Sequence, residues 1–504
     1  MTETIFELSQ AGRRAFSLPA LDVPVRPLDE LVPPEQRRQR PARLPEVSEV
    51  ELVRHFTTLS RKDYGVDQGA YPLGSCTMKY NPKVNERVAA LEGWRGLHPY
   101  EPEELVQGAL RLLDELGRYL AEIAGLQRTT LQPAAGAHGE LTGLLLTRAY
   151  HEAAGNRPTK VIIPDTAHGT NPASVTMAGY EVLAVQSDAR GGIDVADLRA
   201  KAVPGEIACL MVTNPNTLGL FDEHIVEIAQ VIHEAGGLVY YDGANANAVL
   251  GRSRPGDMGF DIVHFNTHKT FSTPHGGGGP GAGPIVVRDI LEPFLPVPVI
   301  AREGEGATAR YRLDYDRPLS IGKMRTFYGN FGVLVRAYAY IRGLGAQGLK
   351  RVSDAAVLNA NYVMAGIRDV LEIPYERTCM HEFVASGAPL KEYGVRTLDL
   401  AKRLLDKGVH PPTIYFPLIV REALMIEPTD TEPKPTLDNL IAAFHEVVEE
   451  AKRDPQLLTE APFTMPVRRL DEVRAARQPV LRQRFSDDED GAASGQDGRA
   501  PSLR

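Results

Sequence analysis

The feature that most constrains the fold is a repeat of short apolar segments, Gly/Asn/Pro turns and helical segments between about residues 125 and 290. The apolar segments are rich in β-branched residues and nearly free of polar ones, as are strands buried on both faces of a parallel sheet. The expected strands are residues 160–164, 207–212, 237–241, 262–265 and 284–287. The pattern therefore predicts an α/β domain with a mostly parallel sheet.

Composition shifts divide the 504-residue chain further. Residues 1–95 are rich in proline and predict an extended arm, and residues 96–345 form the large domain. Residues 346–460 predict a smaller α+β domain, and residues 461–504 a C-terminal extension with a disordered acidic tail. The expected helices are residues 48–59, 103–124, 141–150, 222–235, 331–370, 399–405 and 437–451.

The overall composition excludes several classes of protein. A net charge of −9 argues against a general nucleic-acid binder, and no run of 18 apolar residues predicts a membrane span. The three cysteines have neither metal-ligand spacing nor a disulfide pattern. Together with an acidic N-terminus that lacks an apolar signal core, they predict a cytoplasmic protein with no metal site.

Two charged residues follow neighbouring expected strands. Asp242 ends the apolar run at residues 237–241, and Lys269 follows residues 262–265, with His268 and Thr270 beside it. Ligands of parallel sheets lie beyond the carboxyl ends of the strands. An amine there forms a Schiff base with an aldehyde, and a buried acid keeps a pyridine nitrogen protonated, so the pair indicates a pyridoxal phosphate (PLP) site. Each residue alone has an ordinary alternative, since Lys269 could cap a loop and Asp242 could form a turn.

Other turns after expected strands offer weaker candidates. Gly136, Ala137 and His138 precede a helix whose N-terminus favours a phosphate, although an ordinary helix entry fits as well. His168 could stack on a flat ring or simply order its loop. Asn216, in a turn, could reach a phenolic oxygen of the cofactor. The glycine-rich residues 276–283 could approach an anion closely or form a flexible linker.

Long strings of residues carry a family resemblance. They are residues 71–82, 163–174, 268–276, 379–384 and 410–418. The chain resembles the P-protein family of the glycine cleavage system, glycine dehydrogenase (decarboxylating), and within it subunit 2 of the split form. The resemblance implies a fold-type-I PLP enzyme with a smaller α+β C-terminal domain.

The same resemblance assigns roles to site residues. It implies that Lys269 forms the Schiff base, Asp242 pairs with the pyridinium nitrogen and His168 stacks on the ring, and these three carry the catalysis. The other cofactor-binding residues that it implies are Ala244 on the second face of the ring, Gly136, Ala137, His138 and His268 at the phosphate, and Asn245 or Asn216 at the ring oxygen.

The resemblance also implies the reaction and the partners. Glycine loses its carboxylate, and the aminomethyl group passes to the lipoyl arm of H-protein. The chain is about half as long as the single-chain form, which implies a separate subunit 1, with two copies of each subunit. The proline-rich arm could embrace that partner or wrap its own domain. Candidate groups for the glycine carboxylate are His98, Tyr100, Arg377 and His381.

Three other functions compete with this interpretation. A cysteine desulfurase or another amino-acid decarboxylase would share the fold, and a desulfurase would need a mobile cysteine, for which Cys379 is the candidate by position. A PLP-binding subunit without chemistry of its own would not need both Lys269 and Asp242. A nucleotide-binding module on residues 276–281 would need a P-loop pattern, which the sequence lacks.

Overall fold

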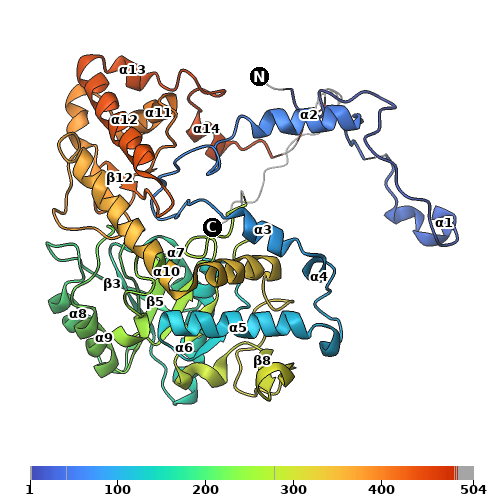
Figure 1. The fold of residues 1–504 in the computed structure, drawn as a ribbon, viewed down its shortest axis with the longest axis horizontal. Coiled ribbons are helices and arrows are strands. Elements are labelled where there is room, and N and C mark those ends of the chain that lie inside the picture. The colour runs from blue at the N-terminus through green and yellow to red at the C-terminus, as the bar shows by residue number, and fades with distance from the viewer. Residues whose placement is uncertain (1–2, 41, 277–278, 482, 484, 486–504) are drawn as a thin grey trace.

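The computed structural model describes residues 3–40, 42–276, 279–481, 483 and 485. It contains a large α/β domain, a smaller C-terminal domain above it in the view of Figure 1, and an N-terminal arm that projects to one side. Among the described residues, no helix combines the length and the apolar character that a membrane crossing requires. The expected acidic tail lies outside the described residues.

A seven-stranded sheet forms the centre of the large domain. The strands in spatial order are β1 (Arg128–Thr130), β7 (Ile285–Val287), β6 (Ile262–Phe265), β5 (Leu238–Gly243), β4 (Ile207–Thr213), β2 (Lys160–Pro164) and β3 (Glu181–Val185). The strands β3, β2, β4, β5 and β6 are parallel, whereas β7 is antiparallel to both β6 and β1. The expected mostly parallel sheet is confirmed.

Helices bury both faces of this sheet. They are α5 (Gln107–Ala124), α6 (Gly136–Ala153), α7 (Thr170–Met177), α8 (Val195–Lys201) and α9 (Ile225–Glu234). Alternate residues of β5 show the two-sided burial, because Val239 and Tyr241 join the core under α5 and α9, whereas Leu238 and Tyr240 join the core under α6 and α7. Side chains of a strand alternate between faces, so a doubly covered strand must be apolar throughout.

The smaller domain packs helices against a three-stranded antiparallel sheet. Its elements are β10 (Phe383–Ser386), β11 (Thr413–Ile414), β12 (Ala423–Ile426), α11 (Thr397–Asp406), α12 (Lys434–Arg453) and α13 (Gln456–Thr459). The long helix α10 (Phe331–Ile367) joins the two domains (Figure 1). Gly345 interrupts α10 with a left-handed φ of 60°, at the domain boundary expected after residue 345.

The N-terminal 95 residues carry short helices, one of them close to the expected residues 48–59. They contain α1 (Leu28–Leu31), α2 (Glu49–Ser60), α3 (Lys83–Ala89) and α4 (Glu92–Arg95). From residue 71 onward the segment packs on its own chain, since Leu73 bridges to Ile426 in β12 and the Gly74 N–H donates to the Met425 carbonyl at 3.2 Å. The part that carries α1 and α2 stands away from both domains (Figure 1).

The remaining strands and α-helices are short. They are the hairpin β8 (Val299–Glu303) and β9 (Arg310–Asp314), and the helix α14 (Glu472–Arg477). The expected helix at residues 222–235 begins later, at Ile225, because the Asp222 carboxylate instead accepts hydrogen bonds from the Ile193 and His224 N–H groups at 2.8 and 3.0 Å.

Candidate active site

Lys269 and Asp242 lie at the same edge of the sheet, beyond the carboxyl ends of adjacent parallel strands. Asp242 is the penultimate residue of β5 and fully buried, and Lys269 lies in the turn after β6. Within the described part of the chain, the Lys269 amine makes no hydrogen bond or ion pair. The nearby Lys79 is different, because its amine donates to Asn247 Oδ1 at 2.8 Å and pairs with Asp430 at 3.3 Å. Of these two lysines, Lys79 is engaged by neighbouring groups of the described chain and Lys269 is not.

The Asp242 carboxylate is held by donors on both oxygens. Oδ2 accepts from His168 Nε2 at 2.8 Å and from Asn171 Nδ2 at 3.0 Å, and Oδ1 accepts from the Ala244 N–H at 3.0 Å. Burial alone would raise the pKa of Asp242, but the neighbouring His264 and His168 outweigh it and hold the pKa well below its ordinary value. The buried acid therefore stays negative and suits a cationic partner.

His264 extends this network into the sheet. Its Nε2 lies 3.3 Å from Asp242 Oδ1, and its Nδ1 lies 2.8 Å from the hydroxyl of Tyr240. Asp242 and His264 point to the same face because they are directly opposite each other on the paired strands β5 and β6. His264 was not expected as a site residue, although a histidine inside an otherwise apolar strand was a usable signal.

The N-terminus of α6 forms a backbone cradle. Ala135 precedes the helix without a side-chain cap, so the first helical N–H groups, those of Gly136, Ala137 and His138, have no intrahelical acceptor. A Cβ on Gly136 would lie 2.2 Å from Asn266 Oδ1, and one on Gly283 would lie 2.1 Å from the Ala135 carbonyl. The close approach that glycine permits here, with the positive end of an 18-residue helix, fits a phosphate group.

Two histidines lie beside the lysine. The rings of His268 and His275 contact edge to face with 5.3 Å between centroids. Burial, followed by the charge of His275, lowers the pKa of His268 to about 3, so its ring is neutral at physiological pH. His268 Nδ1 has no hydrogen-bond partner among the residues that the structure describes, and a Cβ on Gly281 would lie 2.8 Å from it. A neutral ring with a free nitrogen suits the predicted phosphate contact.

The two candidates for the ring oxygen are held differently. Asn216 donates to the Gly191 carbonyl at 2.6 Å, and its Oδ1 accepts from the N–H groups of Leu218 and Leu220 at 3.0 and 3.2 Å. Its side chain is thus engaged in its own turn. Asn245 donates to Glu382 Oε1 at 3.2 Å. The predicted contacts of both residues with a cofactor remain predictions, as do the stacking by His168 and the packing by Ala244.

These residues fit PLP as a group. A free amine, a buried acid that stays negative, an uncapped helix N-terminus and orphaned buried polar atoms such as Asn266 Oδ1 and Thr270 Oγ1 lie around one edge of the sheet. The site therefore offers an amine for an aldehyde, an acid for a pyridine nitrogen and backbone N–H groups for a phosphate.

Comparison with known proteins decides the family. A family model described as "Glycine cleavage system P-protein" matches residues 23–313, and one described as "Glycine dehydrogenase, C-terminal domain" matches residues 352–460. The chain belongs to the glycine cleavage system P-protein family. It is 60% identical over 479 residues to a "Probable glycine dehydrogenase (decarboxylating) subunit 2" of Caldanaerobacter subterraneus subsp. tengcongensis, covering 95% of this chain and 98% of the relative. The corresponding protein of Halalkalibacterium halodurans is 59% identical, covering 95% and 97%.

Solved structures support the fold of this P-protein family member. An inhibitor-bound glycine decarboxylase (P-protein) of the glycine cleavage system matches with a TM-score of 0.70 at 20% identity, covering 83% of this chain and 94% of that one. A cysteine desulfurase from Thermococcus onnurineus NA1 matches with a TM-score of 0.58 at 16% identity, covering 76% and 95%. The expected fold-type-I architecture and the family resemblance are both confirmed.

Cys379, the cysteine that a desulfurase function would require, does not suit that role. Cys379 is fully buried, and burial raises its pKa to about 12. Its backbone N–H and carbonyl are both held by the Asn361 side chain, at 3.2 and 2.7 Å. A cysteine fixed in this way is neither mobile nor activated as a thiolate.

The candidates for the glycine carboxylate lie in different places. His98 and Tyr100 contact the segment around Phe327, and Tyr100 donates to the Thr326 carbonyl at 3.2 Å. Arg377 donates to the carbonyls of Arg190 and Phe221 at 3.2 and 3.0 Å and pairs with Glu223 at 3.2 Å. His381 is fully buried between two glutamates near Lys269.

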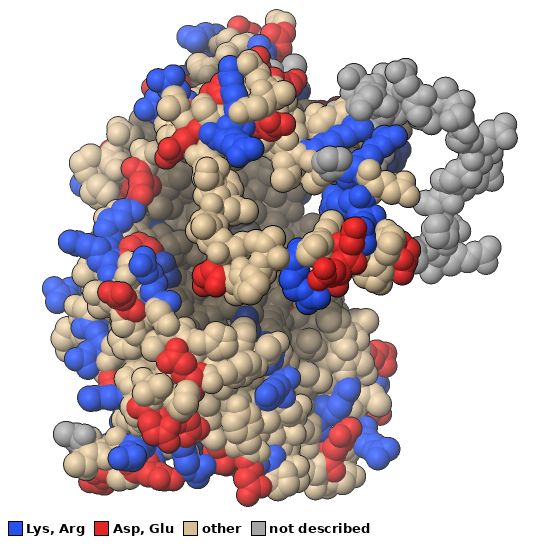
Figure 2. Space-filling model, turned by 90° about the vertical axis from the view of Figure 1, so that its right-hand side faces the viewer, with Lys and Arg blue, Asp and Glu red and all other residues tan. Residues whose placement is uncertain are grey.

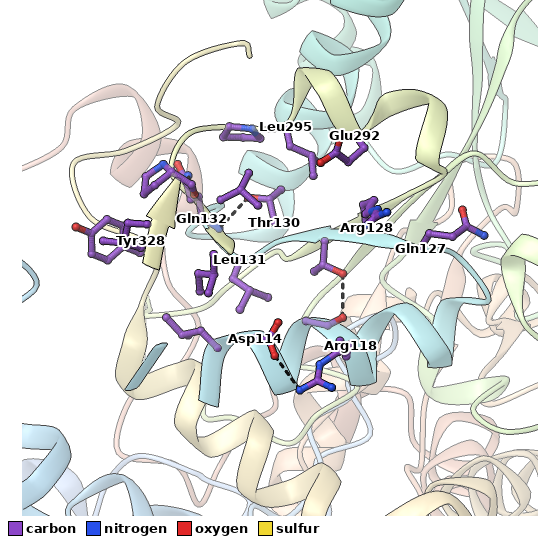
Figure 3. A pocket seen from close by; sticks show the side chains of 18 residues that line it. Asp114, Arg118, Gln127, Arg128, Thr130, Leu131, Gln132, Glu292, Leu295 and Tyr328 are labelled. Atoms are coloured by element: carbon purple, nitrogen blue, oxygen red, sulfur yellow. Dashed lines mark hydrogen bonds and ion pairs between the residues drawn. The ribbon is translucent and has the colours of Figure 1, made fainter. Parts of the chain in front are cut away.

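A separate pocket of about 230 Å³ lies between α5 and the edge strand β1 (Figure 3). Its side chains include Asp114 and Arg118, which pair with each other at 2.8 Å, and Tyr328 at the left of the view. None of the residues assigned above to the PLP site lines it. The pocket is therefore not part of the candidate active site.

Proposed function

We propose that this chain is the PLP-bearing subunit of a glycine dehydrogenase (decarboxylating). In this proposal it removes the carboxylate of glycine as CO2 and passes the aminomethyl group to the lipoyl arm of H-protein. The observation that carries the proposal is the placement of Lys269 and Asp242 at the ends of adjacent strands, in a chain that belongs to the P-protein family.

Each residue contributes a defined task. Lys269 offers the amine for covalent attachment, and Asp242 keeps a protonated ring nitrogen charged because it stays negative itself. The N–H groups at the start of α6 receive the phosphate. His168, hydrogen-bonded to Asp242, offers its ring for stacking. When bound, PLP accepts the electron pair of the bond that breaks at the glycine α-carbon.

Isotope exchange between labelled bicarbonate and the glycine carboxylate tests this activity. The assay combines this chain with subunit 1 and lipoylated H-protein, and we expect exchange that depends on all three. Lys269→Ala should abolish exchange, whereas Lys323→Ala, at a lysine stacked on Tyr315 outside the site, should not. Equal exchange by the Lys269→Ala variant would contradict the proposal.

The exposed part of the N-terminal arm supports a protein partner. Its large apolar residues are Phe16, Leu18, Leu21, Val23, Val25, Leu28 and Leu31, each more than half exposed. On the face shown in Figure 2, uncharged surface surrounds the hollow in the middle of the view, and charges of both signs are interspersed around it. Clustered apolar side chains on a projecting segment are typical of an interaction site. We assign this segment to contact with subunit 1 in an assembly with two copies of each subunit.

Deletion of residues 1–45 tests the assignment. The deletion removes the exposed apolar residues but none of the site residues, so assembly with co-expressed subunit 1 should weaken while PLP binding persists. Light scattering of the purified pair measures the assembly, and absorbance measures the bound PLP. An interface of more than about 1,000 Å² is expected for a stable complex. Full assembly after the deletion would show that the arm wraps its own chain instead.

A further inference from the structure

Two buried glutamates face each other across the small-domain sheet beside the active site. Glu382 precedes β10 and Glu427 follows β12, and these strands pair with Phe383 opposite Ile426. The same register places Glu382 opposite Glu427, and both are fully buried. Like charges directly opposite on paired strands repel each other, so two ionised carboxylates are unfavourable here.

No cation neutralises the two glutamates through direct contact within the described residues. The ion-pair contacts of both run to His381 alone, whose Nε2 lies 3.8 Å from Glu382 Oε1 and 3.9 Å from Glu427 Oε1. His381 is fully buried, and neither of its ring nitrogens has a hydrogen-bond partner in the described chain. Burial, followed by the charge of Lys269, lowers the pKa of His381 to about 3, so its ring is neutral. The histidine therefore points into the pair without cancelling its charge.

The hydrogen bonds to the pair come from neutral groups. Ser75 N–H donates to Glu382 Oε2 at 2.6 Å, and Asn245 Nδ2 donates to Oε1 at 3.2 Å. The N–H and hydroxyl of Thr77 donate to Glu427 at 2.8 and 2.6 Å. Burial, together with the charge of Glu427, raises the pKa of Glu382 well above its ordinary value, and burial raises the pKa of Glu427 to about 7. Both shifts favour the protonated form, so the pair favours a shared proton over two ionised carboxylates.

Lys269 is the charged group of the active site that acts on the pair. Burial raises the pKa of both glutamates and of Cys76, which lies between Ser75 and Thr77 in the sequence. The charge of Lys269 offsets part of each rise. Lys79 also faces Glu427, but its charge is engaged by Asp430 at 3.3 Å. The Lys269 amine must gain and lose a proton during the proposed reaction. It lies within electrostatic reach of a carboxyl pair that can accept one proton.

We propose that Glu382 and Glu427 form a proton-sharing carboxyl pair that serves as the acid–base partner of Lys269. The inference rests on the proposed function of Lys269. In the exchange, an N–H bond of the Lys269 ammonium breaks, its electron pair stays on nitrogen, and the proton forms an O–H bond on the pair. The pair passes from one proton to two, and the reverse step returns the proton. No other reactant is consumed.

Infrared spectroscopy of the full chain tests the shared proton without any substrate. The carbonyl stretch of protonated carboxyl groups should be present at pH 7, decrease toward pH 9, and be lost from this pH range in the double variant Glu382→Gln, Glu427→Gln. Glu422→Gln is the matched control, because Glu422 is also a small-domain acid with little exposure but pairs with Lys391. Absence of the band in the wild-type protein, or its persistence in the double variant, would overturn the proton-sharing pair.

The rate of covalent PLP attachment tests the role toward Lys269. In Glu427→Gln, attachment should slow on the order of a hundredfold while the amount bound at saturation is unchanged, and Glu427→Asp should recover part of the rate. If Glu427→Gln fails to fold by circular dichroism, Glu382→Gln is measured in its place. An unchanged rate would mean that the shared proton has only a structural role, and this result would overturn the proposal. Failure of glycine exchange with a normal infrared band would instead contradict the proposed function alone.

Discussion

Replacing Asp242 with asparagine removes the charge at the centre of the site with little change in shape. The His168 contact gives the scale, since unit charges 2.8 Å apart attract by about 6 kcal/mol at an effective dielectric constant near 20. An amide oxygen would keep a neutral hydrogen bond worth about 1 kcal/mol. Because the neighbouring donors compensate part of the difference, we expect a loss of at least about 3 kcal/mol, or more than roughly 100-fold in the rate of glycine decarboxylation.

The assay separates rate from folding and from cofactor binding. Asp242→Asn should retain the fold and bound PLP, by circular dichroism and visible absorbance, while bicarbonate exchange with glycine falls. Asp222→Asn is the control, because it makes the same change at another buried aspartate, which caps backbone N–H groups away from the site. Exchange by Asp242→Asn within a few-fold of the wild-type rate would refute the pairing of this acid with the ring nitrogen.

The remaining predictions concern the cradle, the second lysine and the carboxyl pair. Gly136→Ala should weaken PLP binding by roughly tenfold or more in a fluorescence titration, because its Cβ would lie 2.2 Å from Asn266, whereas Gly108→Ala, with open space around it, should not. Lys79→Met should destabilise the protein by about 3–5 kcal/mol in urea unfolding, since it leaves buried Asp430 without its partner. The raised pKa of Glu427 adds stability that is fully present below about pH 4.5 and lost as the pH rises through about 7, on the order of 3 kcal/mol. Glu427→Gln should remove that part of the pH dependence, and an unchanged dependence would contradict it.

The sequence was sufficient for the parts of the fold that repeat a local pattern. The apolar runs now seen as β2, β4, β5 and β6 predicted both the sheet and the edge where Lys269 and Asp242 lie. The strand β3 was missed because it is an edge strand whose side chains are mostly exposed, so it lacks the continuous apolar run of its neighbours. The strands of the smaller domain are short, and periodicity over so few residues is weak.

Contacts between distant segments could not be predicted from local pattern. Thr77 donates to Glu427 across 350 positions, and Ser75 reaches Glu382 across 307. Both donors have left-handed backbone, with φ values of 64° at Ser75 and 49° at Thr77, which a residue-type argument would reserve for glycine. The carboxyl pair itself arises only from the pairing of β10 with β12. The contacts of Leu73 and Gly74 with β12 likewise join segments that are distant in the sequence.

The most direct test of the account is the position of the covalent bond to PLP. Borohydride reduction of the PLP-loaded chain, followed by proteolysis and mass spectrometry, should place the label on Lys269 and bleach the visible absorbance. Lys79 is the informative comparison, because its amine is already bound by Asn247, Tyr340 and Asp430. A label on Lys79 or Lys323, or no label at all, would contradict the account.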